Sequence, residues 1–227
     1  MTMDSLYSKA HIRESLNPSP SSPDEDMLWL AGGSPEMLAE VRARAPAQRV
    51  PAAVLVPLVE REGGWTVLLT QRAATLKDHA GQISFPGGRI ESGDPDAWRA
   101  ALREAHEEIG LSESFVEFAG YLPDHWVGTG FRVTPVVAFV RPEFELKIAT
   151  DEVHDAFEVP LGFILDAANH RPRQLRMADL TVKVYDIPYG ERIIWGATAG
   201  MLMTFRRLLQ ARQSALTGAA LDGARPS

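Results

Sequence analysis

The sequence of 227 residues contains no cysteine. This absence excludes disulfide bonds, thiolate zinc sites, iron–sulfur clusters and cysteine nucleophiles, and it fits a reducing compartment. Basic residues are also scarce relative to acidic ones, since 23 lysines and arginines stand against 30 aspartates and glutamates, a formal net charge of −7. We expect no general affinity for nucleic acids or anionic membranes. Any phosphate must therefore be met locally or through a metal ion.

Long hydrophobic runs are missing too. The most apolar stretch, residues 193–205, is too short to span a bilayer, and residues 1–22 lack the apolar core of a signal peptide. We therefore expect a soluble, cytoplasmic protein with no membrane partner. Three catalytic patterns are also absent: the P-loop lysine followed by Ser or Thr, the Gly-x-Ser-x-Gly elbow and the His-Glu-x-x-His zinc motif. These absences argue against P-loop hydrolases, serine hydrolases of the elbow type and zinc proteases.

The composition is that of one globular domain. Hydrophobic residues make up 45% and charged residues 23% of the chain. Residues 1–33 are rich in serine, proline and acids, so we expect a polar, mobile N-terminal arm. A helix-start pattern at Ser34 places the single domain at residues 34–213. Residues 214–227 are expected to fray.

Hydrophobic periodicity predicts the main elements of this domain. Two β-rich runs, 52–59 and 65–72, flank Glu62-Gly63-Gly64 and predict a hairpin. An amphipathic helix is expected from Asp94 to Gly110. Further strands, a hairpin and a final helix are expected at residues 115–122, 133–140, 153–160, 173–189 and 198–213. The order of strands, helix, strands and helix predicts a single mixed α/β or α+β domain.

Three carboxylates share one face of the helix expected before Gly110. Glu104, Glu107 and Glu108 fall within an arc of about 100° beside the apolar stripe. At this spacing they repel one another by about 0.2–0.5 kcal/mol per pair, and the helix dipole disfavours anions in the last turn. One interpretation is a solvated acidic face. The other is a site for a hard cation such as Mg²⁺ or Mn²⁺, which prefers oxygen ligands.

A pair of glycines just upstream favours the second interpretation. Gly87 and Gly88, in FPGGRIESGD, allow the backbone to approach a ligand closely, although an ordinary β-turn would also use them. Together the two segments, GRIESGDPDAWRAALREAHEEIGL, resemble the box of the Nudix hydrolases. The half from Arg103 to Leu111 matches every fixed position. The first half departs twice, because Asp94 replaces the first glutamate and eight residues follow it instead of seven.

The stretch before the box narrows the resemblance. LLTQRAATLKDHAGQISFPGG is similar to the signature of the coenzyme A pyrophosphatase branch of this family, with its spacing intact but with Ala73 in place of a serine and Lys77 in place of an arginine. Lysine keeps the charge but loses the bidentate fork. The segments Thr134–Val137 and Trp195-Gly196 also look like that branch. The resemblance spans about residues 50 to 205.

The resemblance implies a fold, a cofactor and a set of roles. The fold would be a Nudix-type α/β/α sandwich with a mixed sheet, the box forming a loop-helix-loop. A divalent ion, Mg²⁺ or Mn²⁺, would be held by Glu104, Glu107 and Glu108 with the Gly88 carbonyl. Arg103 would orient these glutamates. The base that activates water stays open between Glu107, Glu104 and a late acid, Glu152.

The resemblance also implies a substrate. It predicts hydrolysis of the diphosphate of coenzyme A or its thioesters to 3′,5′-ADP and a 4′-phosphopantetheine product. The expected substrate-binding residues are Arg72, Lys77, Gly81, Gly87 and Arg132. Two alternatives stay open: a Nudix diphosphatase for ADP-ribose, NADH, a dinucleoside polyphosphate or a nucleotide-sugar, and a catalytically silent binding module. The expected partner is a small nucleotide and no nucleic acid, and a homodimer is left open.

Overall fold

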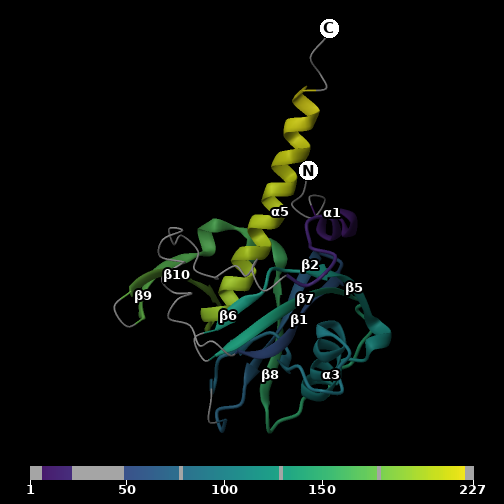
Figure 1. The fold of residues 1–227 in the computed structure, drawn as a ribbon, viewed down its shortest axis with the longest axis vertical. Coiled ribbons are helices and arrows are strands. Elements are labelled where there is room, and N and C mark those ends of the chain that lie inside the picture. Colours follow the sequence, from purple (N-terminus) through teal and green to yellow (C-terminus); the bar gives the residue numbers. More distant parts are fainter. Residues whose placement is uncertain (1–6, 22–48, 77–78, 128–129, 178–179, 223–227) are drawn as a thin grey trace.

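A computed structural model describes residues 7–21, 49–76, 79–127, 130–177 and 180–222. The helix expected to begin near Ser34 lies outside these residues. A mixed sheet forms the centre of the domain, and its longest path runs in the order β3-β2-β1-β7-β5 (Figure 1). Its strands are β1 (Val50–Arg61), β2 (Gly64–Arg72), β3 (Ile83–Ser84), β4 (Gly87–Arg89), β5 (Val116–Tyr121), β6 (His125–Val127), β7 (Phe131–Val140) and β8 (Val153–Pro160).

Strand pairing makes the sheet mixed. β1 and β2 form the antiparallel hairpin predicted around Gly63, while β1 runs parallel to β7 over ten residue pairs, from Val50↔Phe131 to Val59↔Val140. A parallel pair needs a crossover, and the chain between these strands supplies one that includes α3 (Ala97–Ile109). The prediction of a mixed α+β fold is confirmed.

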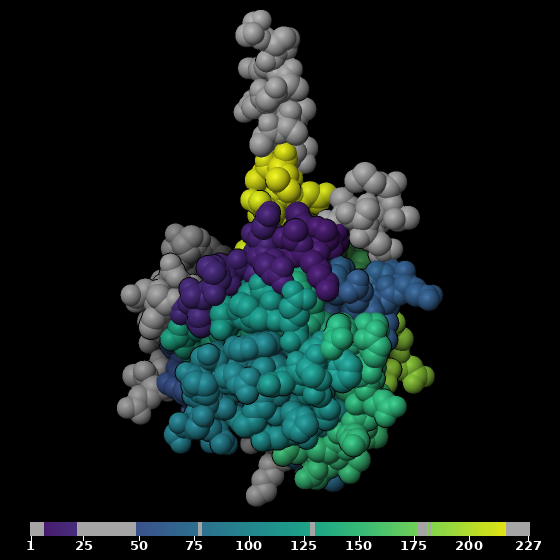
Figure 2. Space-filling model, turned by 90° about the vertical axis from the view of Figure 1, so that its right-hand side faces the viewer, coloured from purple at the N-terminus to yellow at the C-terminus, as the bar shows by residue number. Residues whose placement is uncertain are grey.

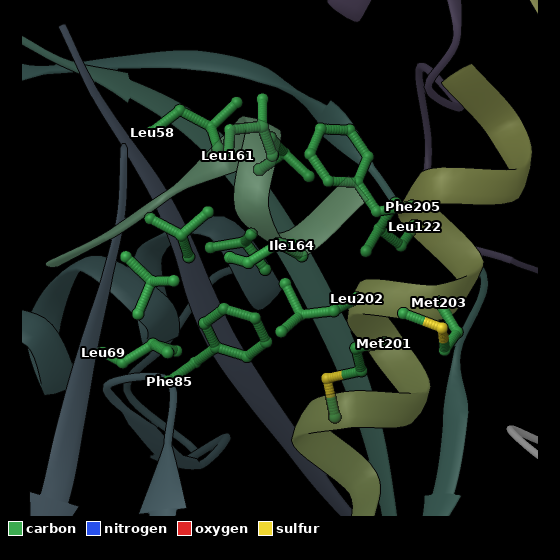
Figure 3. Packing of buried hydrophobic residues seen from close by; sticks show 14 of the residues in the cluster. Leu58, Leu69, Phe85, Leu122, Leu161, Ile164, Met201, Leu202, Met203 and Phe205 are labelled. Atoms are coloured by element: carbon green, nitrogen blue, oxygen red, sulfur yellow. The ribbon is translucent and has the colours of Figure 1, made fainter. Parts of the chain in front are cut away.

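Helices cover both faces of the sheet. In β1, Val56 and Leu58 face one side of the sheet and Leu55 and Val59 face the other, and all four are fully buried. On the first side the core includes α4 (Leu161–Leu165) and α5 (Gly196–Asp222), whose Met201, Leu202 and Phe205 pack toward the sheet (Figure 3). On the second side lies α3. The expected α/β/α sandwich is therefore present.

The helix α3 begins two residues later than expected. Its N-cap is Asp96, whose Oδ1 accepts a 2.8 Å hydrogen bond from the Arg99 N–H, whereas Asp94 lies outside the helix and turns toward Arg103. The helix ends where predicted, at Gly110, because this residue adopts φ 69°, a conformation that favours glycine. Alanines dominate the buried face of α3, so the helix lies close to β1.

A second, smaller sheet confirms the hairpin predicted around residues 173–189. It contains β9 (Arg171–Met177), β10 (Leu180–Tyr189) and β11 (Arg192–Ile194), in the order β11-β10-β9. Two short 3₁₀ helices, η2 (Glu113–Phe115) and η3 (Ala167–Asn169), complete the connections of the described chain. In Figure 1 the hairpin projects beside the base of α5.

The prediction of a mobile N-terminal arm is wrong for residues 7–21. Residues Lys9–Glu14 form α1, which packs on the domain (Figure 2). Within this helix Ile12 is 0% exposed. Asn17 and Tyr121 exchange two backbone hydrogen bonds of 3.0 and 2.8 Å. The reason is a short apolar stripe within a polar segment, because Ile12 and Leu16 stand one helical turn apart. The remainder of the expected arm lies outside the described residues.

The prediction of a frayed C-terminus is wrong as well for residues 214–222. The helix α5 continues through these residues to Asp222 (Figure 1). Ala215 and Leu216 are strong helix formers and continue the helix beyond the core. Among the helices of the described residues, none combines the length and apolar character needed to cross a membrane.

A buried histidine makes the stability of the fold depend on pH. His125 is 0% exposed, its Nδ1 donates to the Pro123 carbonyl at 2.8 Å, and its Nε2 lies 3.3 Å from the Thr204 hydroxyl. Burial lowers the pKa of His125 from 6.5 to about 4, and the charge of Arg207 acts in the same direction. Between pH 6.5 and about pH 4, the unfolded chain therefore binds a proton on His125 that the folded protein does not bind.

We expect this difference to remove stability as the pH falls. Because the folded pKa is the lower one, the stabilisation is complete above the unfolded pKa and decreases below it, by about 2 kcal/mol at pH 5. Urea unfolding of the wild type and His125→Asn at pH 7 and pH 5 measures it, with the exposed His154→Asn as control. The wild type should lose about 2 kcal/mol more than His125→Asn. Equal losses in both proteins would contradict the assignment.

Candidate active site

The glycine pair forms a strand pressed between β1 and α3. β4 pairs with β1 through Ala53↔Gly88 and Val54↔Gly87, so the alternative of an ordinary turn does not hold. A Cβ on Gly87 would lie 2.4 Å from the Ala53 carbonyl oxygen, and one on Gly88 would lie 2.5 Å from the Glu104 carboxyl carbon. Backbone packing therefore demands glycine at Gly87, whereas a Cβ at Gly88 would require the Glu104 side chain to move.

The three glutamates of α3 occupy different environments. Glu108 is 4% exposed, and its Oε2 accepts a 3.2 Å hydrogen bond from the Gly87 N–H. The Glu104 side chain is 15% exposed and lies against Gly88, whereas the Glu107 side chain is 55% exposed. The glutamates thus extend from the buried base of α3 to the solvent, and the interpretation as a wholly solvated acidic face is wrong.

Burial raises the pKa of both inner carboxyls. Desolvation is the largest cause for Glu108, whose pKa rises to about 7 although the Gly87 N–H opposes the shift. Desolvation also raises the pKa of Glu104, against the effect of Arg103. The charge of Glu152 contributes to both shifts. Nearby negative charges that cannot all be solvated are the environment in which a cation binds favourably.

Glu152 reaches this cluster because its loop is tied to α3. The Ala149 N–H donates to the Glu108 carbonyl and the Lys147 N–H to the Ile109 carbonyl, both at 2.9 Å. The Glu152 carbonyl then accepts from the Ala73 N–H at 2.9 Å, next to the end of β2. Glu152, which follows Glu108 by 44 positions in the sequence, is thereby held beside α3.

Arg103 connects the carboxylates to the preceding loop. Its Nη1 donates to Glu104 Oε1 and to Glu107 Oε2, both at 2.9 Å. Its Nε and Nη2 donate to the two oxygens of Asp94 at 3.1 and 3.0 Å, and Nη2 also donates to the Arg89 carbonyl. The hydrogen bond from Arg103 is the main reason that the pKa of Asp94 is lowered. Asp94 is therefore an anchor for Arg103.

The donor chemistry at this site suits a hard divalent ion. Within the described residues, no three His, Asp or Glu side chains lie close enough together to hold a metal as they stand. The Arg103 guanidinium donates hydrogen bonds to both Glu104 and Glu107. The set nevertheless provides only oxygen donors. Two of its carboxylates, Glu104 and Glu108, are desolvated and repel each other. The chemistry of these donors therefore fits Mg²⁺ or Mn²⁺, the divalent ions that prefer oxygen ligands.

A cavity of about 710 Å³ opens beside this cluster. Gly87 and Gly88 line it together with Arg72, His79 and Arg89. Nη1 of Arg72 lies 3.9 Å from Glu108 Oε1, while its buried Nε has no hydrogen-bond partner among the described residues. The cavity therefore combines cationic donors with a glycine strand that leads to the carboxylates. Such a combination can hold an anionic ligand next to a metal site.

Two of the expected substrate-binding residues stand apart from the cavity lining. Arg132 Nε donates to the buried Asp124 at 2.6 Å and its Nη2 to the Ser21 carbonyl at 3.0 Å, so Arg132 ties the N-terminal segment to β7. Gly81 adopts φ 70° and closes the loop after β2, since its N–H donates to the Arg72 carbonyl at 3.2 Å. Lys77 lies outside the described residues.

Other parts of the cavity wall come from distant segments. Leu175 of β9 and Met201 of α5 were not predicted, whereas Trp195, just before α5, belongs to the Trp195-Gly196 pair that the sequence singled out. The second sheet thus supplies a wall to the site. Gln82 lines the cavity within the signature stretch, at a position that the signature leaves variable. No sequence signal marks Leu175, because only the tertiary position of the hairpin brings it here.

Comparison with known proteins fits this arrangement. A mixed sheet between helices, with a carboxylate helix behind a glycine strand, is the architecture that the box predicted. Residues 49–180 match the family model of the NUDIX domain, and the chain belongs to the Nudix family. The predicted membership is thereby confirmed, while the coenzyme A branch stays a prediction.

Two similar proteins carry the name of a Nudix hydrolase. The "Uncharacterized Nudix hydrolase NudL" of Enterobacter sp. (strain 638) is 38% identical over 167 residues, covering 74% of this chain and 86% of the relative. The protein of the same name from Escherichia coli (strain K12) is 40% identical over 151 residues, covering 66% and 78%.

Solved structures show weaker likeness. A MutT/nudix family protein from Enterococcus faecalis aligns with a TM-score of 0.48 at 17% identity, over 85% of this chain and 76% of that one. A C. elegans Ap4A hydrolase binary complex aligns with a TM-score of 0.46 at 20% identity, over 71% and 98%.

Proposed function

We propose that the protein is a divalent-metal-dependent Nudix hydrolase that cleaves the diphosphate of coenzyme A or its thioesters. The reaction adds water across one P–O–P linkage and yields 3′,5′-ADP and 4′-phosphopantetheine or its acyl form. One observation carries the proposal: within the stretch that is similar to the coenzyme A signature, Arg72, His79 and Gln82 line the cavity, and its two final glycines form the strand beside the box glutamates.

The proposed roles come from the resemblance of the box, and the contacts of these residues support them. Glu104, Glu107 and Glu108 would hold Mg²⁺ or Mn²⁺, joined by the Gly88 carbonyl. The ion, when bound, neutralises charge on the diphosphate and on its transition state. Arg103 keeps the glutamates in place through its bonds to Glu104 and Glu107.

The base that takes a proton from the attacking water is proposed from the same cluster. Glu152 is exposed and influences the pKa of Glu104, so it combines solvent access with proximity to the carboxylates. Glu104 and Glu107 are the other candidates, and both also bond to Arg103. A carboxylate whose oxygens are not needed by the ion is the better base.

The substrate would enter between charges of opposite sign. Arg72 stands 3.9 Å from Glu108, at the boundary between the cationic part of the cavity and the carboxylates. A diphosphate at this boundary would meet a guanidinium on one side and the ion on the other. Arg89 lies at the same wall and adds positive charge in an acidic protein. The positive charge in the cavity would thus attract the diphosphate although the net charge of the protein is −7.

A panel of diphosphates tests this proposal. The purified protein is incubated with coenzyme A, acetyl-coenzyme A, ADP-ribose, NADH and a diadenosine polyphosphate, each with Mn²⁺ or with EDTA, and the products are identified by mass. We expect 3′,5′-ADP from the coenzyme A compounds with Mn²⁺ and no product with EDTA.

Other outcomes assign the alternatives. Much faster turnover of ADP-ribose, NADH or the dinucleotide would overturn the coenzyme A assignment while keeping the diphosphatase. No turnover of any compound would favour a catalytically silent binding module. Product formation in EDTA would contradict the role of the metal.

A further inference from the structure

The loop between β2 and β3 carries an unusual backbone conformation at the wall of the cavity. Among the described residues, His79 is the one non-glycine residue with positive φ, at 58°. This left-handed region is sparsely used by residues that have a Cβ. Residues that surrounding contacts hold in this left-handed region are often found at functional sites.

Three backbone hydrogen bonds fix the end of this loop. The Arg72 N–H donates to the Gln82 carbonyl at 2.9 Å, and the Gly81 N–H donates to the Arg72 carbonyl at 3.2 Å. The Gln82 N–H then donates to the His79 carbonyl at 3.1 Å. His79 is thus part of a closed turn anchored on the arginine at the end of β2.

The imidazole of His79 has one nitrogen engaged. Nδ1 lies 2.9 Å from Gln82 Oε1, and an amide oxygen only accepts, so Nδ1 carries the hydrogen. Among the described residues, no hydrogen bond engages Nε2. His79 and Gln82 both line the cavity, as do Arg72 and Arg89. A proton on Nε2 would give the ring a positive charge and a second donor in the same cavity.

We propose that His79 binds substrate by donating its Nε2 hydrogen to a phosphate oxygen. The Gln82 oxygen accepts from Nδ1 and so allows both nitrogens to be donors while the phosphate supplies the opposite charge. The identity of the substrate rests on the proposed function, but the phosphate contact does not. His79 adds a donor to the side of the cavity that carries Arg72.

The variant His79→Asn tests the contact with little change to the backbone. Asparagine tolerates the left-handed region well, and its shorter side chain cannot place a donor at the position of Nε2. His154→Asn is the matched control, because His154 is exposed on β8 and does not line the cavity. Two measurements are made: steady-state kinetics with coenzyme A and Mn²⁺, and calorimetric titration with ADP and Mg²⁺.

We expect His79→Asn to raise KM by about 10- to 100-fold, the effect of one hydrogen bond to a charged group, with kcat within about threefold. The affinity for ADP should fall by a similar factor, and His154→Asn should behave as the wild type. Unchanged KM and ADP affinity in His79→Asn would overturn the proposal, and so would a loss confined to kcat. Absence of ADP binding by the wild type would overturn it as well.

A second comparison identifies the phosphate. Coenzyme A carries a 3′-phosphate that dephospho-coenzyme A lacks, and both carry the diphosphate. An equal rise of KM for the two substrates places His79 at the diphosphate, and a rise for coenzyme A alone places it at the 3′-phosphate. If neither compound is hydrolysed, the proposed function fails, whereas weaker ADP binding by His79→Asn still supports the contact.

Discussion

Glu107→Gln should lower kcat by about 10²- to 10⁴-fold while the fold is retained, because the proposed metal site would lose a carboxylate oxygen and its negative charge. The Glu107 side chain is 55% exposed, so the substitution buries no new polar group. The glutamine oxygen can still accept from Arg103 Nη1. The effect should therefore be on metal binding and catalysis, with little change in the free energy of unfolding.

Three measurements check this expectation: kcat with coenzyme A and saturating Mn²⁺, the dissociation constant of Mn²⁺ from calorimetry, and urea unfolding. Glu145→Gln is the matched control, because Glu145 is an exposed acid outside the carboxylate cluster. Near-normal kcat together with unchanged Mn²⁺ affinity would refute the metal role of Glu107. Loss of the folded state would refute the claim that this position is free of structural demands.

Gly88→Ala should lower kcat/KM by about 100-fold or more, since a displacement of about 1 Å in a catalytic group can cost that much. An alanine Cβ at this position would lie 2.5–2.6 Å from the carboxyl carbon and both oxygens of Glu104. Contact at this distance is impossible, so the carboxylate must leave its position. Arg103 would be displaced as well, because its Nη1 bonds to Glu104.

Gly93→Ala provides the control for this substitution. Gly93 lies in the loop that follows β4 and leads to α3, and no atom lies within 4 Å of the Cβ it would acquire. Kinetics of both variants should show a large loss of activity for Gly88→Ala alone. Urea unfolding should show little change for either variant, because the atoms that must move are the end of the flexible Glu104 side chain. Equal activities would contradict the packing of Gly88 against Glu104.

Local sequence patterns were sufficient for most of the elements and for the inner carboxylates. A continuous β-rich run identified β1, and helical spacing with Gly110 identified α3 and its end. These patterns act over a few residues, so they survive in any tertiary context. They failed at α1, because its buried contribution is mainly Ile12 within a polar segment, and no local rule shows that the sheet has a place for it.

Contacts across the chain decided what the patterns could not. Asp94 looked like a defective box residue, yet its two oxygens bind Arg103 in three dimensions. Arg132 looked like a phosphate ligand, yet a buried partner, Asp124, binds it away from the cavity. Charge and spacing in the sequence identify side chains that are able to bind a ligand. The orientation of each side chain depends on hydrogen-bond partners that are distant in the sequence.

The sequence by itself determined the Nudix family, the mixed α+β class and the three glutamates of α3. Short-range periodicity and motif spacing carry this information. Only the tertiary structure decided which glutamates are buried, that Glu152 joins them, and that His79, Leu175 and Trp195 enclose the cavity with Arg72. The reason is physical: burial, electrostatic coupling and cavity shape arise from the packing of segments that the chain order leaves far apart.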